Sequence, residues 1–172
     1  MKKETYIEQL LKRSVQEKES MHDNTERKAF DLAVRYLGNR EHSQKEIIEK
    51  LSRKEFSEEV INKTLDRLGE LGLIDDRSFA VNYVGSRLRK KSCGHYKLKH
   101  ELLQKGIPED VVDEVLADFD NSSLCLEAAL KKLPFIKGDE RQKHRKLYAF
   151  LTNRGFDSHT IRETLEEVFR EE

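Results

Sequence analysis

Apolar residues recur along this chain at intervals of three and four, the spacing that places them on one face of an α-helix. The same arrangement of apolar and polar positions occurs three times, over residues 50–65, 101–116 and 150–165. The offsets between the copies are 51 and 49 residues, a length typical of helical repeat units. The aligned apolar positions include Leu51, Leu102 and Leu151, then Phe56, Ile107 and Phe156, and finally Leu65, Leu116 and Leu165.

Each copy predicts a helix, a tight turn and a second helix. Gly106 and Gly155 stand where the first helix ends, because glycine readily adopts the left-handed backbone that closes a helix. Glu55 takes this position in the first copy, so either a non-glycine residue enters the same conformation, at a cost of about 1 kcal/mol, or that helix ends differently. The second helices are expected to begin at Ser57, at Pro108 and at the pair Asp157 and Ser158.

A further helix precedes each copy, over residues 27–37, over residues 77–90 and from residue 122 to 133. One more helix is predicted over residues 3–19, followed by a linker at 21–24. The residues expected to cap or stop these helices and their neighbours are Ser43 with Glu46, Asp75 with Asp76, Ser122 with Ser123, and Pro134.

The pattern therefore predicts an all-α protein of three tandem three-helix units, nine or so helices in all, after an N-terminal helix. Period-two alternation is missing, so nothing predicts a sheet. The expected boundaries are 1–28, 29–76, 77–121 and 122–172. Hydrophobic residues make up only 36% of the chain and charged residues 38%, which favours an elongated, curved stack of units in which each touches only its neighbours.

The net charge is zero, but the charges are separated into blocks. Residues 77–107 hold eight basic residues against one acid, residues 108–127 hold seven acids and no base, and residues 128–154 are basic again. The basic face predicted to bind a partner or DNA comprises Arg77, Arg87, Arg89, Lys90, Lys91, Lys97, Lys99 and Lys105. Tyr96, which lies among these cations, is a candidate for stacking on a base.

Simpler interpretations stand beside these. Cations near a helix C-terminus offset its dipole, and charged runs keep a surface solvated. Solvation explains the second basic run, residues 137–146, as well as binding does, and it is the favoured interpretation of the acidic block. Tyr36 and Tyr83 fall on apolar faces, where core packing is expected.

Residues 72–80 read Gly-Leu-Ile-Asp-Asp-Arg-Ser-Phe-Ala. This turn resembles the "GYLDDRRFA" turn of the RecX family of RecA regulators, although Ser78 replaces a second arginine and removes one positive charge. The resemblance covers about residues 29 to 168. Further matching positions are Ala33, Tyr36, Leu37, Arg40 and Ser43 upstream, then Gly94, Leu98, Glu101, Leu102, Lys105, Gly106 and Ile107, and downstream Leu147, Leu151, Arg154, Gly155, Phe156 and Ile161.

The resemblance implies a regulator that binds RecA filaments on single-stranded DNA. Such proteins modulate, and usually inhibit, the recombinase, ATPase and coprotease activities of RecA in homologous recombination, DNA repair and the SOS response. It implies binding without a cofactor, a catalytic residue or a small-molecule substrate, and it leaves open whether DNA is contacted directly. The alternative is a helical DNA-binding module of the transcription-regulator type that acts without RecA, since paired helices and basic blocks also occur there.

Other chemistry finds little support in the sequence. Cys93 and Cys125 lack a CxxC partner, and Cys93 with His95 lacks the remaining ligands of a zinc site. Phosphate-binding and nucleophile motifs are missing, so an enzyme is not expected. No apolar stretch approaches the roughly 20 residues of a membrane span. We therefore expect a cytoplasmic protein with reduced thiols, no metal and no membrane contact.

Overall fold

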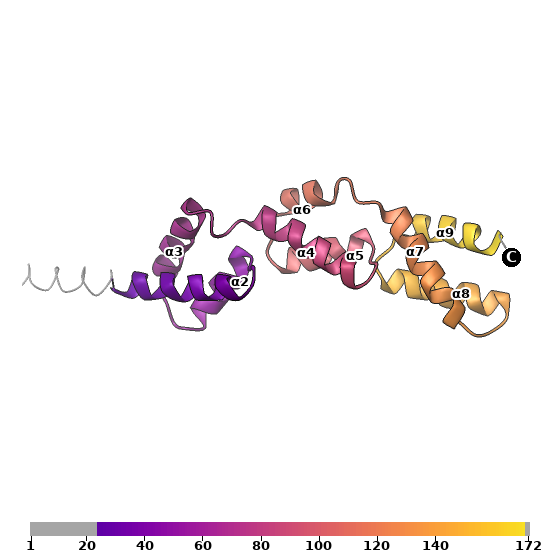
Figure 1. The fold of residues 1–172 in the computed structure, drawn as a ribbon, viewed down its shortest axis with the longest axis horizontal. Coiled ribbons are helices and arrows are strands. Elements are labelled where there is room, and N and C mark those ends of the chain that lie inside the picture. The colour runs from indigo at the N-terminus through magenta and orange to yellow at the C-terminus, as the bar shows by residue number, and fades with distance from the viewer. Residues whose placement is uncertain (1–23, 171–172) are drawn as a thin grey trace, which may run out of the picture. The chain divides into compact units, whose positions relative to one another are not determined.

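A computed structural model describes residues 24–170, and the helix predicted over residues 3–19 lies outside this range. The described residues form α-helices, one 3-10 turn and no β-strand (Figure 1). The chain divides into two compact units, up to Asp75 and from Asp76 onward. The helices cover residues 24–39, α2 (Gln44–Ser52), α3 (Glu58–Glu70), α4 (Asp76–Lys90), α5 (His95–Gln104), α6 (Glu109–Leu116), α7 (Asn121–Lys132), the 3-10 turn η1 (Leu133–Phe135), α8 (Glu140–Asn153) and α9 (Ser158–Arg170).

The first unit is a three-helix domain made by the helix over residues 24–39 together with α2 and α3. The predicted Ser43 cap is present, because its Oγ accepts a hydrogen bond from the Glu46 amide at 3.2 Å. Ser57 caps α3 in the same way. The apolar faces of these helices meet in one core that holds Ala29, Ala33, Ile47, Leu51, Val60, Ile61, Leu68 and Ile74.

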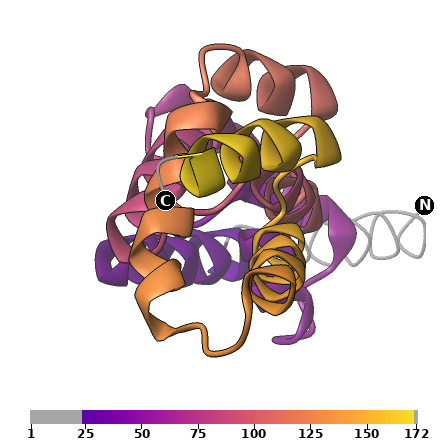
Figure 2. The same ribbon diagram turned by 90° about the vertical axis from the view of Figure 1, so that its right-hand side faces the viewer.

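The second unit contains two further three-helix domains, each with its own core. In the second domain α4 and α5 both pack against α6. In the third domain α7 packs against α8 and α9, and Figure 2 shows α9 crossing α7. The second core holds Phe79, Ala80, Cys93, Leu98, Leu102, Ile107, Val112 and Leu116, and the third includes Cys125, Ala129, Leu147, Leu151, Phe156, Ile161 and Leu165.

The predicted turn is confirmed in all three domains. Glu55, Gly106 and Gly155 have φ angles of 63°, 80° and 83°, so the glutamate does enter the left-handed region. In each turn the apolar residue that follows donates its amide to the carbonyl five residues earlier, which is the defining bond of a Schellman ending. These bonds join Phe56 to Leu51, Ile107 to Leu102 and Phe156 to Leu151.

Two local predictions were wrong. The cap of α7 is Asp120, whose Oδ1 accepts from the Ser123 amide at 3.0 Å, and the helix begins at Asn121 rather than at the expected serines. A carboxylate one turn earlier satisfies the free amides, which leaves Ser122 and Ser123 inside the helix. The first described helix already includes Asn24, which was assigned to a linker.

Candidate functional site

The predicted basic face lies on the second domain, from α4 through the loop after it into α5. The structure divides all of its cations except Lys105 into two groups. One group is neutralised by acidic side chains of the same domain. The other group projects from the end of α4 and the start of α5 without such partners.

The most enclosed ion pair joins Arg87 on α4 to Glu101 on α5. The guanidinium binds the carboxylate through two bonds, Nε to Oε2 at 2.7 Å and Nη2 to Oε1 at 2.6 Å. Tyr83 donates its hydroxyl to the same carboxylate at 3.0 Å. Burial acts to raise the pKa of Glu101, but the bonds from Arg87 and Tyr83 outweigh it and lower that pKa below its usual value. Arg87 and Tyr83 therefore fix α4 against α5.

Two other predicted cations are paired with α6. Arg77 contacts Glu114 at 2.8 Å, and both side chains are more than half exposed. Lys99 contacts Asp113 at 2.7 Å and Glu109 at 2.9 Å, and its hydrogen bonds to these acids raise its pKa. The acidic residues of α6 thus neutralise part of the basic face within the second domain, whereas solvation was the favoured interpretation of the acidic block.

The second group comprises Arg89, Lys90, Lys91 and Lys97. In the described part of the chain no carboxylate lies within ion-pairing distance of any of them. The first three are exposed and Lys97 is half-buried. Lys105 is also half-buried and lies at the C-cap of α5, away from this group in the chain. Tyr96 is 63% exposed and its ring meets that of His95 edge-on, and its role as a stacking residue stays a prediction.

The loop before α5 contacts the third domain through its backbone. The amide of Gly94 donates to the Arg154 carbonyl at 2.9 Å, and the amide of Tyr96 donates to the Gly155 carbonyl at 3.2 Å. In return, Arg154 donates its Nη1 to the Ser92 carbonyl at 3.0 Å. We call this contact between the second and third domains the junction.

Asn121, the first residue of α7, bridges the junction with its side chain. Its Oδ1 accepts from the His95 amide at 3.0 Å, and its Nδ2 donates to Asp157 at 2.7 Å and to Thr160 at 3.2 Å. Each polar atom of this amide is therefore used. Asn121 fixes the start of α5 against the start of α9.

Tight packing at the junction requires glycine. A Cβ atom placed on Gly94 would lie 2.3 Å from the Gly155 carbonyl oxygen, and one placed on Gly155 would lie 2.4 Å from the Lys97 Cβ. Backbone atoms cannot yield as the tip of a long side chain does. Main-chain contacts therefore hold the second and third domains in a fixed relative position, here called their register.

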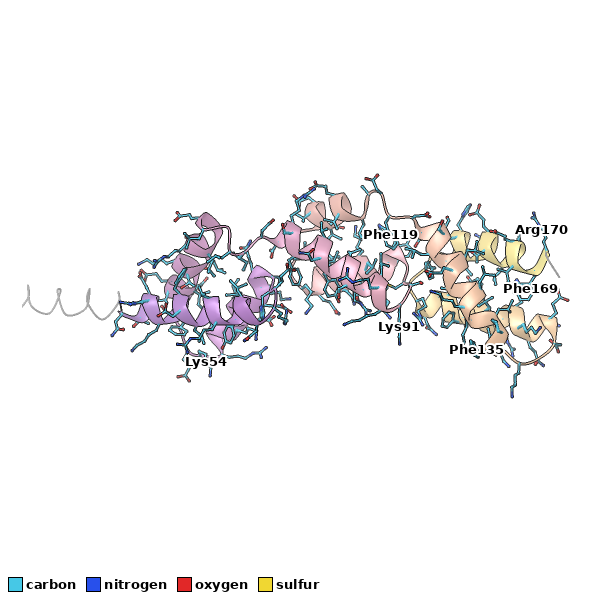
Figure 3. The ribbon with its side chains drawn as sticks, in the orientation of Figure 1. Lys54, Lys91, Phe119, Phe135, Phe169 and Arg170 are labelled. Atoms are coloured by element: carbon cyan, nitrogen blue, oxygen red, sulfur yellow. The ribbon has the colours of Figure 1, made fainter. Side chains whose placement is uncertain are left out.

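This register creates an open cavity of about 290 Å³, here called the junction cavity. Figure 3 shows Lys91 where the second domain meets the third. Five cations from the two domains converge on the cavity around one aromatic ring. Its lining comprises Lys90, Lys91, Ser92, Ala128, Lys131, Lys132, Phe150 and Arg154.

Sequence reasoning identified Lys90 and Lys91 but missed the third-domain half of this cavity. The available signal was a pair of lysines at the end of the first helix of both the second and the third domain, Lys90-Lys91 and Lys131-Lys132. Only the packing of the domains brings these pairs together with Arg154, whose guanidinium lies 4.8 Å from the centre of the Phe150 ring.

The two cysteine thiols differ from this charged, exposed surface in their chemistry. Cys93 and Cys125 are free and buried, and burial raises the pKa of both, so the unreactive thiol form is favoured. Among residues 24–170 no cluster of three or more His, Cys, Asp or Glu side chains is placed to hold a metal ion. Within the same range no helix combines the length and apolar character that crossing a membrane requires.

Sequence comparisons cover all three domains. Models of the RecX family match residues 29–68 as the first three-helix domain, 75–116 as the second and 120–165 as the third. The regulatory protein RecX of Chlorobium phaeobacteroides is 65% identical over 150 residues, which are 87% of this chain and 99% of that protein. That of Prosthecochloris aestuarii is 53% identical over 148 residues, 86% of this chain and 98% of that protein.

Solved structures agree with the fold. A crystal structure of a regulatory protein RecX covers 83% of this chain and 73% of its own, with a TM-score of 0.76 and 28% identity. The RecX structure from Lactobacillus salivarius gives a TM-score of 0.77 over 84% of this chain and 97% of that one. Its identity is 23%, so this second likeness concerns the fold alone.

Proposed function

Because the chain belongs to the RecX family, we propose that it binds RecA filaments assembled on single-stranded DNA and inhibits their recombinase, ATPase and coprotease activities. The observation that carries the proposal is the match of every domain, in order, to that family. The protein acts by binding in the cytoplasm, without a cofactor or a catalytic residue.

The geometry of the junction supports a binding function of this kind. An assembly of repeated subunits offers the same surface many times, so a protein that contacts several subunits at once gains affinity through multivalency. A fixed register between two domains strengthens this effect, because less conformational freedom is lost when both domains bind at once. The main-chain bonds between Gly94 and Arg154 and between Tyr96 and Gly155 provide that register.

Within the predicted basic face we assign the contact to the cations that have no acidic partner among residues 24–170. Arg89, Lys90, Lys91 and Lys97 have their charges available, whereas Arg77, Arg87 and Lys99 are occupied by Glu114, Glu101 and the α6 acids respectively. An ion pair must be broken before its cation meets a new partner, which reduces the net gain on binding. Exposed Tyr96 lies beside the available group and belongs to the same proposed surface.

The charge of the helices argues against the alternative of a module that reads duplex DNA without RecA. In a helix-turn-helix the second helix enters the major groove between two rows of phosphates. The helices in that position here are α3, α6 and α9, and acidic residues outnumber basic ones in each of them. Such helices are repelled by the phosphates that flank the groove.

The test is ATP hydrolysis by preformed RecA filaments on single-stranded DNA, titrated with the protein at well below one copy per RecA. A suitable RecA is that of Chlorobium phaeobacteroides, whose RecX is 65% identical to this chain. Inhibition at such ratios supports the proposal, because one molecule then affects many RecA subunits. A parallel titration with excess free single-stranded DNA distinguishes filament binding from simple sequestration of DNA.

The opposite result is also informative. If hydrolysis is unchanged at equal copies of the two proteins, the proposed function is wrong. Sequence-specific binding to duplex DNA without RecA would then favour the transcription-regulator alternative.

A further inference from the structure

We propose that the junction cavity binds phosphate groups of a nucleic-acid backbone. The proposal goes beyond the proposed function, because such binding requires no RecA, and the two can fail separately. It rests on the charge of the cavity, on the way its cations are held, and on its size and lining.

The charge of the cavity remains strongly positive after its neighbours are considered. Lys131 is paired with Glu127, which also accepts a hydrogen bond from the Ser92 hydroxyl at 2.6 Å. The C-terminal ends of α4 and α7 add roughly half a negative charge each. When the Glu127 carboxylate and the two helix ends are set against the five lining cations, an excess of about three positive charges remains. Offsetting two helix dipoles therefore accounts for only part of the cluster.

The cations themselves remain available to a ligand. No carboxylate in the described part of the chain lies within ion-pairing distance of Lys90, Lys91 or Lys132. No carboxylate of residues 24–170 lies that close to Arg154 either, and within this range its guanidinium uses one of its five N–H donors, in the bond to the Ser92 carbonyl. These side chains come from both domains, so the cluster exists only while the junction is intact.

Phe150 and Ser92 hold part of this cluster in place before any ligand arrives. Arg154 lies over the Phe150 ring at 4.8 Å and Lys132 Nζ lies 5.5 Å from the same ring centre. Cation–π contacts of this kind restrict the cations without neutralising them. A guanidinium held in one orientation loses less entropy when it binds a phosphate through two parallel bonds.

The size and lining of the cavity favour a phosphate backbone over other anions. A cavity of about 290 Å³ is at the lower limit of small-molecule pockets, enough for a phosphate and its sugar. Its ring is already occupied by Arg154 and Lys132, so it provides no platform for a base and no basis for reading sequence. A nucleic-acid strand carries a charge on every nucleotide, which matches several clustered cations better than an isolated carboxylate does.

The experiment measures binding of a short fluorescent oligothymidylate to the full chain, without RecA, over a series of KCl concentrations. The test variant is Lys90→Gln/Lys91→Gln/Lys132→Gln, which removes three cavity cations that have no acidic partner in the described part of the chain. The matched control is Lys28→Gln/Arg35→Gln/Lys54→Gln, which removes three exposed cations of the first unit and changes the net charge equally. Circular dichroism and thermal melting verify that both variants are folded.

The expected result is a loss of affinity of about tenfold or more for the test variant, and a salt dependence whose log–log slope is less steep by about 2, because each phosphate contact on a single strand contributes about 0.7. The control variant should retain both the affinity and the slope. Lys90→Arg/Lys91→Arg/Lys132→Arg should bind like the original chain. Oligoadenylate should bind with the same affinity as oligothymidylate. A parallel titration with duplex DNA establishes whether the cavity accepts single strands alone or duplexes as well.

Several results would overturn the proposal. One is the absence of oligonucleotide binding at low salt, and another is an equal loss in the test and control variants. Binding of ATP, inorganic tripolyphosphate or polyglutamate that depends on the cavity cations while oligonucleotide binding does not would assign the cavity to a different anion. None of these results bears on inhibition of RecA, which the ATPase titration measures.

Discussion

The amide of Gly94 donates a hydrogen bond to the carbonyl oxygen of Arg154 at 2.9 Å, joining residues of two different three-helix domains. The two backbones can approach this closely because neither Gly94 nor the neighbouring Gly155 carries a side chain at the contact. Arg154 turns its guanidinium back to the Ser92 carbonyl, so the same residue also closes the contact from the other side.

Gly94→Ala should destabilise the protein by about 1–3 kcal/mol, the usual cost of forcing an extra carbon into a packed region. The added Cβ would lie 2.3 Å from the Gly155 carbonyl oxygen. Gly85→Ala is the control, since its Cβ meets only the Arg89 guanidinium at 3.5 Å and alanine favours the helix by about 1 kcal/mol. Urea denaturation measures both. An unchanged free energy of unfolding for Gly94→Ala would contradict the tight junction.

Glu101→Gln should cost about 2 kcal/mol at neutral pH, because charge-assisted bonds to Arg87 and Tyr83 are weakened. The pKa of Glu101 is lowered in the folded state. Its contribution is therefore complete above the ordinary glutamate pKa of about 4.3 and is lost as the pH falls through the lower folded value. Denaturation at several pH values should show the original chain and Glu101→Gln converging in acid. A constant difference would contradict the assigned pairing.

Acidification should destabilise the first unit through His42. This side chain is buried, and burial lowers its pKa although its Nδ1 donates to the Arg40 carbonyl at 2.9 Å. The unfolded chain then binds a proton more readily than the folded one, so stability is complete above the ordinary pKa of about 6.5 and declines as the pH falls toward the folded value. NMR titration of the imidazole resonances measures the pKa directly. His42→Gln should reduce the pH dependence of unfolding near pH 6.

The two groups of cations on the second domain should differ in their effect on RecA. Lys90→Gln/Lys91→Gln should weaken inhibition of RecA ATP hydrolysis several-fold. Arg77→Gln/Lys99→Gln removes the same charge from residues already paired with acids and should have a smaller effect. Equal loss in the two variants would show that only net charge matters. Reversing Arg87 is unsuitable for this test, because a glutamate there would face Glu101.

The local structure of the protein was accessible from the sequence because its causes lie within a few residues. The spacing of Leu51, Leu102 and Leu151, the glycines that end helices and the serine caps act over one or two turns of the chain. The family resemblance, now confirmed over residues 29–165, required no more than matching such local motifs. Alignment with Gly106 and Gly155 made a left-handed backbone at Glu55 one of two possibilities, and the structure shows that this conformation forms.

The sequence by itself thus determined the helices, their order, the three repeated domains and the family. Only the tertiary structure decided which charges are available, since Arg87 meets Glu101 and Lys99 meets Asp113 across fourteen residues of chain. It also brought Lys90 and Lys91 to Lys131, Lys132 and Arg154. Helix periodicity determines on which face of its own helix each residue lies. Whether side chains far apart in the sequence meet depends on how complete domains pack. That packing depends here on Gly94, Gly155 and Asn121, whose roles at the junction become visible only when the two domains are in contact.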